Sequence, residues 1–203
     1  MNTKTIIIFI AVLFVLDLLL QLYRGWKRND LFTQLSRYLA DKDFAAFDEL
    51  LASPQTKRVL PPFNIAFLKL NEALILEDEK MTDESFDSFN MTMTKSQKEV
   101  LYKRGFYYYL DKRNKDKTDH YYELLRQMNV ADLQTLDVMY DTYILKGSKY
   151  LDIIRNAAEK AGEKEKMPYY SLLADIYQNI GDKDKEKEYR KIVKDYTDKL
   201  IGK

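Results

Sequence analysis

The chain has 203 residues, and its 33 Lys and Arg nearly balance its 32 Asp and Glu, which leaves a formal net charge of +1. Nucleic-acid-binding domains usually carry a basic excess or stripe; neither is present, so nucleic acid is not an expected partner. The absence of Cys excludes disulfides, thiolate nucleophiles and Cys-based zinc sites. Gly (6) and Pro (4) are scarce and no stretch alternates as a strand does, so the sequence predicts an all-α protein.

An apolar segment opens the chain, from Thr5 to Tyr23, and has about the length that spans a bilayer as a helix. A cleaved signal peptide is the alternative interpretation. Such a peptide needs small residues around its cleavage site, and residues 20–24 offer none. We therefore expect residues 1–27 to form an uncleaved single-pass membrane anchor with its flank.

The charges around this segment predict its orientation. Arg24, Lys27 and Arg28 follow it, whereas Lys4 and the terminal amine precede it. The positive-inside rule then favours a short outside N-terminus and a cytoplasmic C-terminal domain over a domain on the outer face. Trp26 fits the belt of aromatic residues at a membrane interface.

Asp17 is an ionisable residue inside the apolar segment, about two helical turns before Arg24. Intramembrane ionisable groups often mark functional sites, so Asp17 is a candidate to pair with a partner membrane helix. The alternative, which we favour, is that its carboxylate reaches the headgroups or Arg24.

The remainder, residues 28–203, has the rhythm of repeated helical hairpins, whose first helices begin roughly 33 to 36 residues apart. Such a period is typical of an array in which each hairpin buries its apolar face against its neighbours. Gly147 and Gly181 are expected to end helices in the left-handed conformation. The predicted helices are Arg28–Ala40, Phe44–Ala52, Pro62–Glu77, Asp83–Asn90, Lys95–Lys112, Lys117–Met128, Ala131–Lys146, Ser148–Ala161, Glu165–Ile180 and Asp182–Leu200.

The last hairpin carries the clearest motif, Tyr170-x-x-Leu173-Ala174-x-x-Tyr177-x-x-x-Gly181-Asp182. This motif resembles the first helix and turn of a tetratricopeptide repeat (TPR). The third hairpin repeats part of it, as Leu101-x-x-x-Gly105-x-x-Tyr108, whereas residues 62–90 fit poorly. The resemblance implies a right-handed α-solenoid of about five hairpins that binds proteins. A generic helical bundle is the alternative.

The resemblance also implies a concave groove, which in the third hairpin would be lined by Tyr102, Lys103, Phe106 and Tyr109. The three aromatic residues are spaced i, i+4, i+7 and so form one stripe of a helix. Accessible aromatic side chains are good anchors for a partner peptide. The alternative is that Tyr102 and Phe106 belong to the core and that Tyr107 is the exposed residue.

In the fourth and fifth hairpins, the groove positions implied by the resemblance include Asp137, Asp141, Asp175 and Gln178. Such an acidic surface favours a partner segment with Lys or Arg beside apolar residues. The Lys, Arg and Asn with which carboxylate-clamp members of the family hold a peptide C-terminus are missing. A terminal-carboxylate ligand is therefore not expected.

No pattern of catalytic residues, metal ligands or cofactor-binding residues stands out. His120 is the only histidine, and the six glycines are scattered singly rather than grouped in a phosphate loop. We expect a non-enzymatic, membrane-tethered scaffold or adaptor that holds a protein or peptide partner near the membrane, without metal or cofactor. The alternatives are a secretion chaperone or cell-wall-associated factor on the outer face and, more remotely, a hydrolase on a helical scaffold.

Overall fold

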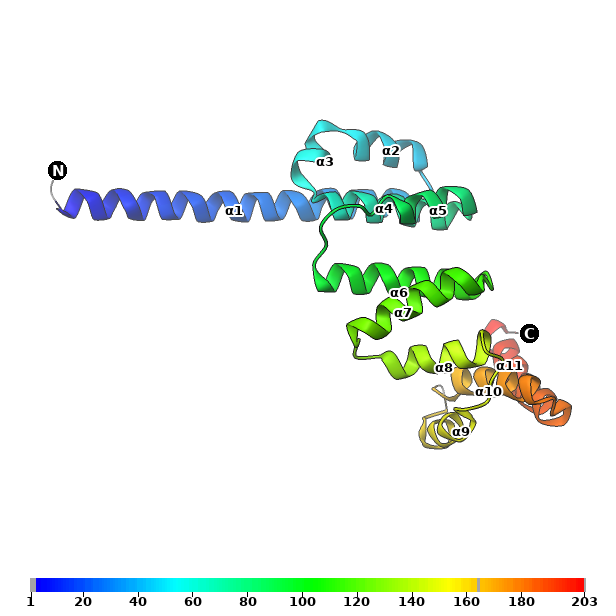
Figure 1. Cartoon of the computed structure of the whole chain (residues 1–203). Helices are drawn as coiled ribbons and strands as arrows, with labels where there is room; N and C mark the ends of the chain where they lie inside the picture. The colour runs from blue at the N-terminus through cyan, green and yellow to red at the C-terminus, as the bar shows by residue number, and fades with distance from the viewer. Residues whose placement is uncertain (1–2, 164, 203) are drawn as a thin grey trace. The chain divides into compact units, whose positions relative to one another are not determined.

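A computed structural model gives the fold of this chain and describes the backbone of residues 3–163 and 165–202. Side chains are described from residue 21 onward, except at positions 24, 164, 201 and 203. The described backbone is helical and contains no strand, which confirms the prediction of an all-α protein (Figure 1). The chain divides into two compact units, residues 1–97 and residues 98–203.

Five helices precede the boundary between the units: α1 (Thr3–Ala40), α2 (Phe44–Ala52), α3 (Pro54–Val59), α4 (Pro62–Leu76) and α5 (Glu79–Asp87). Helix α6 (Lys95–Asp111) begins just before that boundary and belongs mainly to the second unit. It is followed by α7 (Lys115–Met128), α8 (Leu133–Tyr143), α9 (Leu151–Lys160), α10 (Lys166–Ile180) and α11 (Lys183–Ile201).

Helix α1 is continuous, so the boundary that we expected between residues 27 and 28 falls inside one helix (Figure 1). Its C-terminal half buries Leu35 and Leu39, which are four residues apart and so share one face. They pack in one apolar cluster with Phe47 of α2 and Leu68 of α4. This half of α1 is therefore a core helix of the first unit.

The helices of the described residues include none that combines the length and the apolar character needed to cross a bilayer. The side chains of residues 1–20 lie outside the described residues. This range holds Asp17 and most of the segment that we predicted to be an anchor.

Capping side chains explain where several helices of the first unit begin. Asp43 accepts a hydrogen bond from the Ala46 amide at the start of α2, which begins and ends as predicted. Asp78 accepts one from the Met81 amide, and α5 therefore begins four residues before the predicted start. Helix α3, which we did not predict, begins at Pro54 behind the capping hydroxyl of Ser53.

The second unit consists of three consecutive hairpins, α6–α7, α8–α9 and α10–α11. One apolar cluster joins the first two hairpins through Phe106, Leu125 and Leu136, and another joins the last two through Ile154 and Leu173. Each hairpin thus buries its apolar residues against the next one along the chain.

Two predicted glycine turns have different outcomes. Gly181 ends α10 in the left-handed conformation (φ +83°), as we expected. Gly147 does not adopt a positive φ, which corrects the expectation for the α8–α9 turn; the left-handed residue there is Lys146 (φ +54°).

Candidate partner-binding site

The exposed face of α6 differs from the predicted groove face. Phe106 is 0% exposed and Tyr109 is 4% exposed, so neither can line an accessible groove, and the prediction for these two residues is wrong. Tyr102 is half-buried, and Tyr107 is 39% exposed. The alternative assignment, in which Tyr107 is the accessible aromatic residue, fits the structure.

Aromatic packing between α6 and α7 accounts for this burial. The Tyr109 ring stacks on Tyr121 at 5.7 Å between ring centroids, and Phe106 lies 6.1 Å from the ring of Tyr122. Gly105 lets the two helices approach, because a Cβ at that position would lie 2.6 Å from the Tyr121 ring. The predicted stripe of α6 is therefore the side that holds α7.

Lys103, the fourth predicted groove residue of α6, forms two ion pairs within the second unit. Its Nζ lies 2.7 Å from Asp132, at the start of α8, and 2.8 Å from Glu99, one turn earlier on α6. Hydrogen bonds to Asp132 and Glu99 raise the pKa of Lys103 above its ordinary value. Lys103 thus links α6 to the next hairpin.

Asp137 belongs to a reciprocal pair of contacts between α7 and α8. The Tyr122 hydroxyl donates a hydrogen bond to Asp137 at 2.6 Å, and the Tyr140 hydroxyl donates one to Asp119 at 2.7 Å. The rings of Tyr122 and Tyr140 stack between these bonds, with 4.0 Å between their centroids. Each helix therefore supplies one tyrosine donor and one aspartate acceptor.

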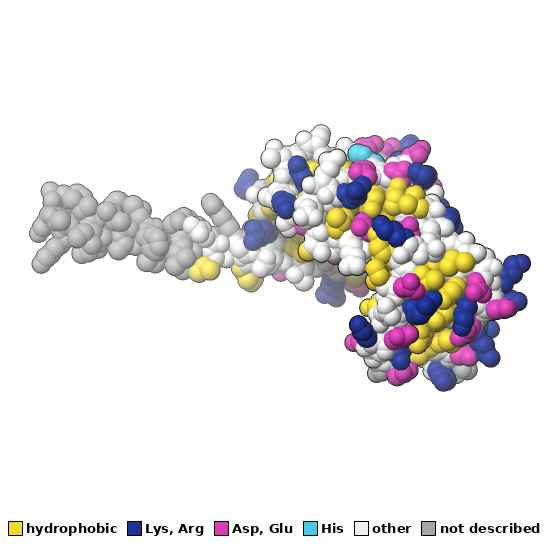
Figure 2. Space-filling view, turned by 60° about the horizontal axis from the view of Figure 1, so that its bottom comes forward, with side chains coloured by type: hydrophobic (Ala, Val, Ile, Leu, Met, Phe, Trp, Pro, Cys, Tyr) yellow, Lys and Arg dark blue, Asp and Glu magenta, His cyan; other side chains and the backbone are white. Residues whose placement is uncertain are grey.

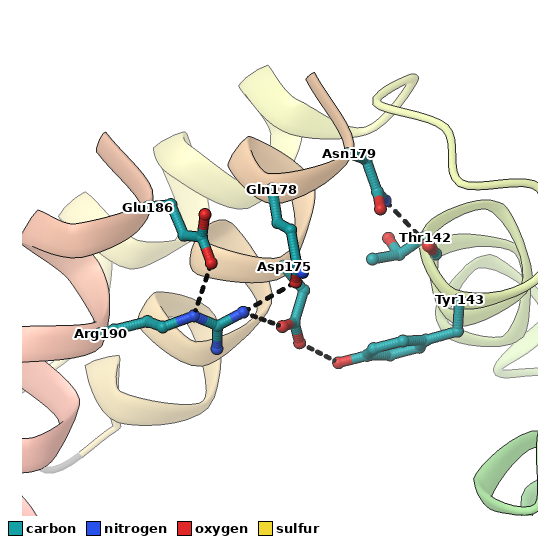
Figure 3. Close-up of polar contacts among 7 residues, drawn as sticks. All are labelled: Thr142, Tyr143, Asp175, Gln178, Asn179, Glu186 and Arg190. Atoms are coloured by element: carbon teal, nitrogen blue, oxygen red, sulfur yellow. Dashed lines mark hydrogen bonds and ion pairs between the residues drawn. The ribbon is translucent and has the colours of Figure 1, made fainter. Parts of the chain in front are cut away.

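Asp175 and Gln178 on α10 lie in a second polar network, which connects three helices (Figure 3). The Tyr143 hydroxyl of α8 donates a hydrogen bond to Asp175 at 2.7 Å. Arg190 of α11 donates to Asp175 at 3.2 Å and to Gln178 at 2.9 Å, and its Nε donates to Glu186 at 2.9 Å. These contacts fix α10 between its neighbours.

Asp141, the remaining acidic candidate, accepts a hydrogen bond from the Lys149 amide at 3.1 Å and so closes the α8–α9 turn. The three predicted groove aspartates, Asp137, Asp141 and Asp175, therefore have partners within the chain. The expectation that these carboxylates attract a basic partner segment loses its basis, because each already serves the packing of the hairpins.

A cavity of about 340 Å³ lies between the C-terminal end of α6 and α8. Apolar and aromatic atoms make up much of its wall, and a carboxylate and a guanidinium lie on its rim. Arg113 adopts a left-handed backbone conformation (φ +54°) in the α6–α7 turn. The lining residues are Tyr107, Leu110, Asp111, Arg113, Met139 and Tyr143.

The cavity is continuous with the Tyr143–Asp175 contact, since Tyr143 takes part in both. Burial and the hydrogen bond to Asp175 raise the pKa of Tyr143. The charges of Arg190 and Arg113 act in the opposite direction but are smaller, so the pKa of Tyr143 lies above its ordinary value. Tyr143 thus stays a neutral hydrogen-bond donor at physiological pH. Sequence reasoning missed Leu110, Arg113 and Met139, for which no motif provides a signal.

Among the described residues, no group of three or more His, Cys, Asp or Glu side chains is arranged to hold a metal ion. His120 is exposed, and its ring lies 5.2 Å from that of Tyr121. The lining of the α6–α8 cavity gives the candidate site its mixed apolar and charged character.

The Tyr140–Asp119 bond should stabilise the fold within a defined pH range. Burial and this hydrogen bond raise the pKa of Tyr140 to about 12. Burial raises the pKa of Asp119, but the hydrogen bonds from Lys115 and Tyr140 outweigh it and bring that pKa below its ordinary value. A raised tyrosine pKa gives stability that is lost above about pH 10, and a lowered aspartate pKa gives stability that is lost below about pH 4.

Tyr140→Phe is therefore expected to lower the free energy of unfolding by about 1 kcal/mol at neutral pH. The difference from the wild type should narrow below about pH 4 and above about pH 10. Urea denaturation at acidic, neutral and alkaline pH measures it. A difference that stays constant over this range would show that the loss does not come from the hydrogen bond between the Tyr140 hydroxyl and the ionised Asp119.

Comparison of the chain with protein-family models, with curated proteins and with solved structures finds no match.

Proposed function

We propose that the second unit is a TPR-like right-handed solenoid that binds a protein partner at the α6–α8 cavity. The spacing of the hairpins supports this proposal: α6, α8 and α10, the first helices of the three hairpins, begin 38 and 33 residues apart. So does the burial of Leu173, Ala174 and Tyr177, three of the six motif residues of the last hairpin. The observation that carries the proposal is the cavity itself, with the exposed ring of Tyr107 at its edge.

The lining of the cavity defines the chemistry of the partner. Leu110, Met139 and the ring of Tyr107 offer apolar surface for one bulky apolar side chain, and such aromatic surfaces are frequent anchors in protein interfaces. Asp111 and Arg113 are exposed on the rim, where they can pair with charges of either sign. The preferred ligand is thus an apolar residue flanked by charged residues.

We further propose that the chain acts as a non-enzymatic adaptor tethered to the membrane by its N-terminal segment. The length of the apolar sequence from Thr5 to Tyr23 supports the tether. The basic residues after that segment favour a cytoplasmic position for both units. The adaptor would hold its partner at the membrane surface, where tethering raises the local concentration of both proteins.

A photo-crosslinking phenylalanine analogue in place of Tyr107 tests the binding surface in intact cells. We expect a discrete cross-linked product from this position and none from the same analogue at Ile153, an exposed residue of α9. Arg113→Ala should reduce the product by about tenfold, since interface arginines often dominate binding. The matched control is Lys160→Ala, an exposed basic residue of α9.

Two results would contradict this proposal. Equal cross-linking from positions 107 and 153 would mean that the cavity is not a preferred contact. An equal yield of cross-linked product in Arg113→Ala and Lys160→Ala would mean that the rim of the cavity does not contact the partner.

A further inference from the structure

A second cavity, of about 570 Å³, lies within the first unit, between α1 and the short helix α3. It overlaps the end of the apolar N-terminal segment, since Gln21 and Tyr23 belong to both. Gln21, Gly25 and Arg28 of α1 are spaced i, i+4, i+7 and share one side of that helix. The lining residues are Gln21, Tyr23, Gly25, Lys27, Arg28, Arg58 and Val59.

Helix α3 is placed beside α1 by its own buried residues. Thr56 is 0% exposed, and Leu60, which follows the helix, is 3% exposed and packs with Leu35 in the core of the first unit. With this side of α3 fixed inward, Lys57 and Arg58 are exposed. The core of the unit therefore holds Arg58 next to the basic residues of α1.

The cavity is strongly positive. Lys27, Arg28 and Arg58 line it and no acidic residue does. Among the described residues, neither Arg28 nor Arg58 forms an ion pair, and Lys27 lies over the ring of Tyr23 at 5.9 Å. Asp30, the nearest carboxylate along α1, accepts a hydrogen bond from Gln34 on the following turn. The positive charge of the cavity is thus not neutralised by the lining residues.

Large apolar side chains are exposed beside this charge. Leu22, Tyr23 and Trp26 are 62%, 56% and 65% exposed. Figure 2 shows hydrophobic and basic side chains together at the point where the coloured side chains of α1 follow the grey ones. Tyr and Trp of this kind are typical of the headgroup level of a bilayer, and Lys and Arg at that level attract anionic lipids.

We propose that this cavity binds the phosphate of an anionic lipid headgroup. Guanidinium groups form paired hydrogen bonds with phosphate, and Arg28 and Arg58 approach the cavity from two different helices. Gly25, which also lines the cavity, leaves room there, because a Cβ added to it would meet no atom within 4 Å. This inference rests on the proposed membrane tether, since it places the end of the apolar segment at the headgroup level.

The single tryptophan of the chain, Trp26, makes the proposal testable, because its fluorescence reports on one position beside the cavity. The full chain is reconstituted into phosphatidylcholine vesicles containing a fixed fraction of phosphatidylglycerol. Bromine atoms quench tryptophan fluorescence on contact. In one set of vesicles the anionic lipid is brominated, and in a second set the neutral lipid is brominated at the same mole fraction. We expect brominated phosphatidylglycerol to quench Trp26 more strongly.

Three variants distinguish binding of the lipid in the cavity from a general electrostatic attraction of the chain to an anionic bilayer. Arg28→Gln and Arg58→Gln should each reduce the preference for the anionic lipid by about fivefold. Gly25→Leu should reduce it as well, since it fills the cavity and leaves the charge unchanged. The matched control, Lys183→Gln with Lys187→Gln, removes two exposed charges from α11 and should leave the preference intact.

The remaining outcomes distinguish the inference from the proposed function. Equal quenching by the two brominated lipids overturns the lipid site and leaves the tether in place. A lack of quenching by either lipid overturns the tether, and the lipid site with it. If the chain in vesicles of phosphatidylcholine alone binds inorganic phosphate, and brominated phosphatidylglycerol is not preferred in its absence, the cavity takes a soluble phosphate and the lipid assignment is wrong.

Discussion

Phe106→Ala is expected to lower the free energy of unfolding of the second unit by about 3–5 kcal/mol, as is usual when a buried phenylalanine is truncated. Phe106 is 0% exposed and packs with Leu125, Val130 and Leu136, which come from α7, the following turn and α8. Its removal would leave a hole where two hairpins meet, because the surrounding helices can collapse only in part. Urea denaturation followed by circular dichroism measures the loss.

Tyr107→Ala is the matched control, one residue along the same helix. Its side chain is 39% exposed, so we expect the free energy of unfolding to change by less than about 1 kcal/mol. Similar losses for the two variants would show that Tyr107 is also part of the core and could not serve as an accessible anchor.

Gly105→Ala should destabilise the second unit by about 1–2 kcal/mol, which is the strain of overpacking less the gain in helix propensity. The new Cβ would lie 2.6 Å from Cε2 and Cζ of Tyr121. That ring has little room to move, since Tyr109 stacks on it and the centroid of the Tyr102 ring lies 6.1 Å from its own. Thermal denaturation should show a lower midpoint.

The control is Gly25→Ala, the same substitution in α1. No atom lies within 4 Å of the added Cβ, so the gain in helix propensity should stand alone. We expect this variant to be as stable as the wild type or more stable, by up to about 1 kcal/mol. If Gly105→Ala also stabilises the chain, the close approach of α6 and α7 does not depend on glycine.

Helix positions could be predicted well from local signals. Helix α2 begins and ends as predicted, because Asp43 provides a strong start signal and Ser53-Pro54 a stop. Ser53 and Pro54 also begin α3. A prediction based on the spacing of two-helix hairpins does not expect this extra helix. Asp78 is the capping residue of α5, whereas the sequence prediction begins this helix at Asp83.

The face of α6 could not be predicted from its sequence. Phe106, Tyr107, Tyr108 and Tyr109 are consecutive, and successive residues of a helix point about 100° apart, so aromatic side chains surround the helix. Only the position of α7 decides which of them are buried. The structure instead exposes Val100, Arg104, Tyr107 and Asp111, a stripe that shares no residue with the predicted groove face.

The roles of the acidic residues could not be predicted either, because their partners are distant in sequence. Asp175 accepts hydrogen bonds from Tyr143, 32 residues earlier, and from Arg190, 15 residues later. A sequence pattern shows such an aspartate as one more charged residue on a helix. Whether it faces a ligand or a neighbouring hairpin is settled by packing.

The continuity of α1 has a mechanical consequence. Its 38 residues form one helix, about 57 Å long, whose C-terminal half is part of the core of the first unit. If its first half lies in a membrane, as we propose, no flexible linker separates the membrane from that unit, in contrast to a domain on a Gly/Ser-rich tether. A tilt or rotation of the membrane segment would then rotate the first unit by the same angle. The continuous helix would also hold that unit at a fixed distance from the bilayer.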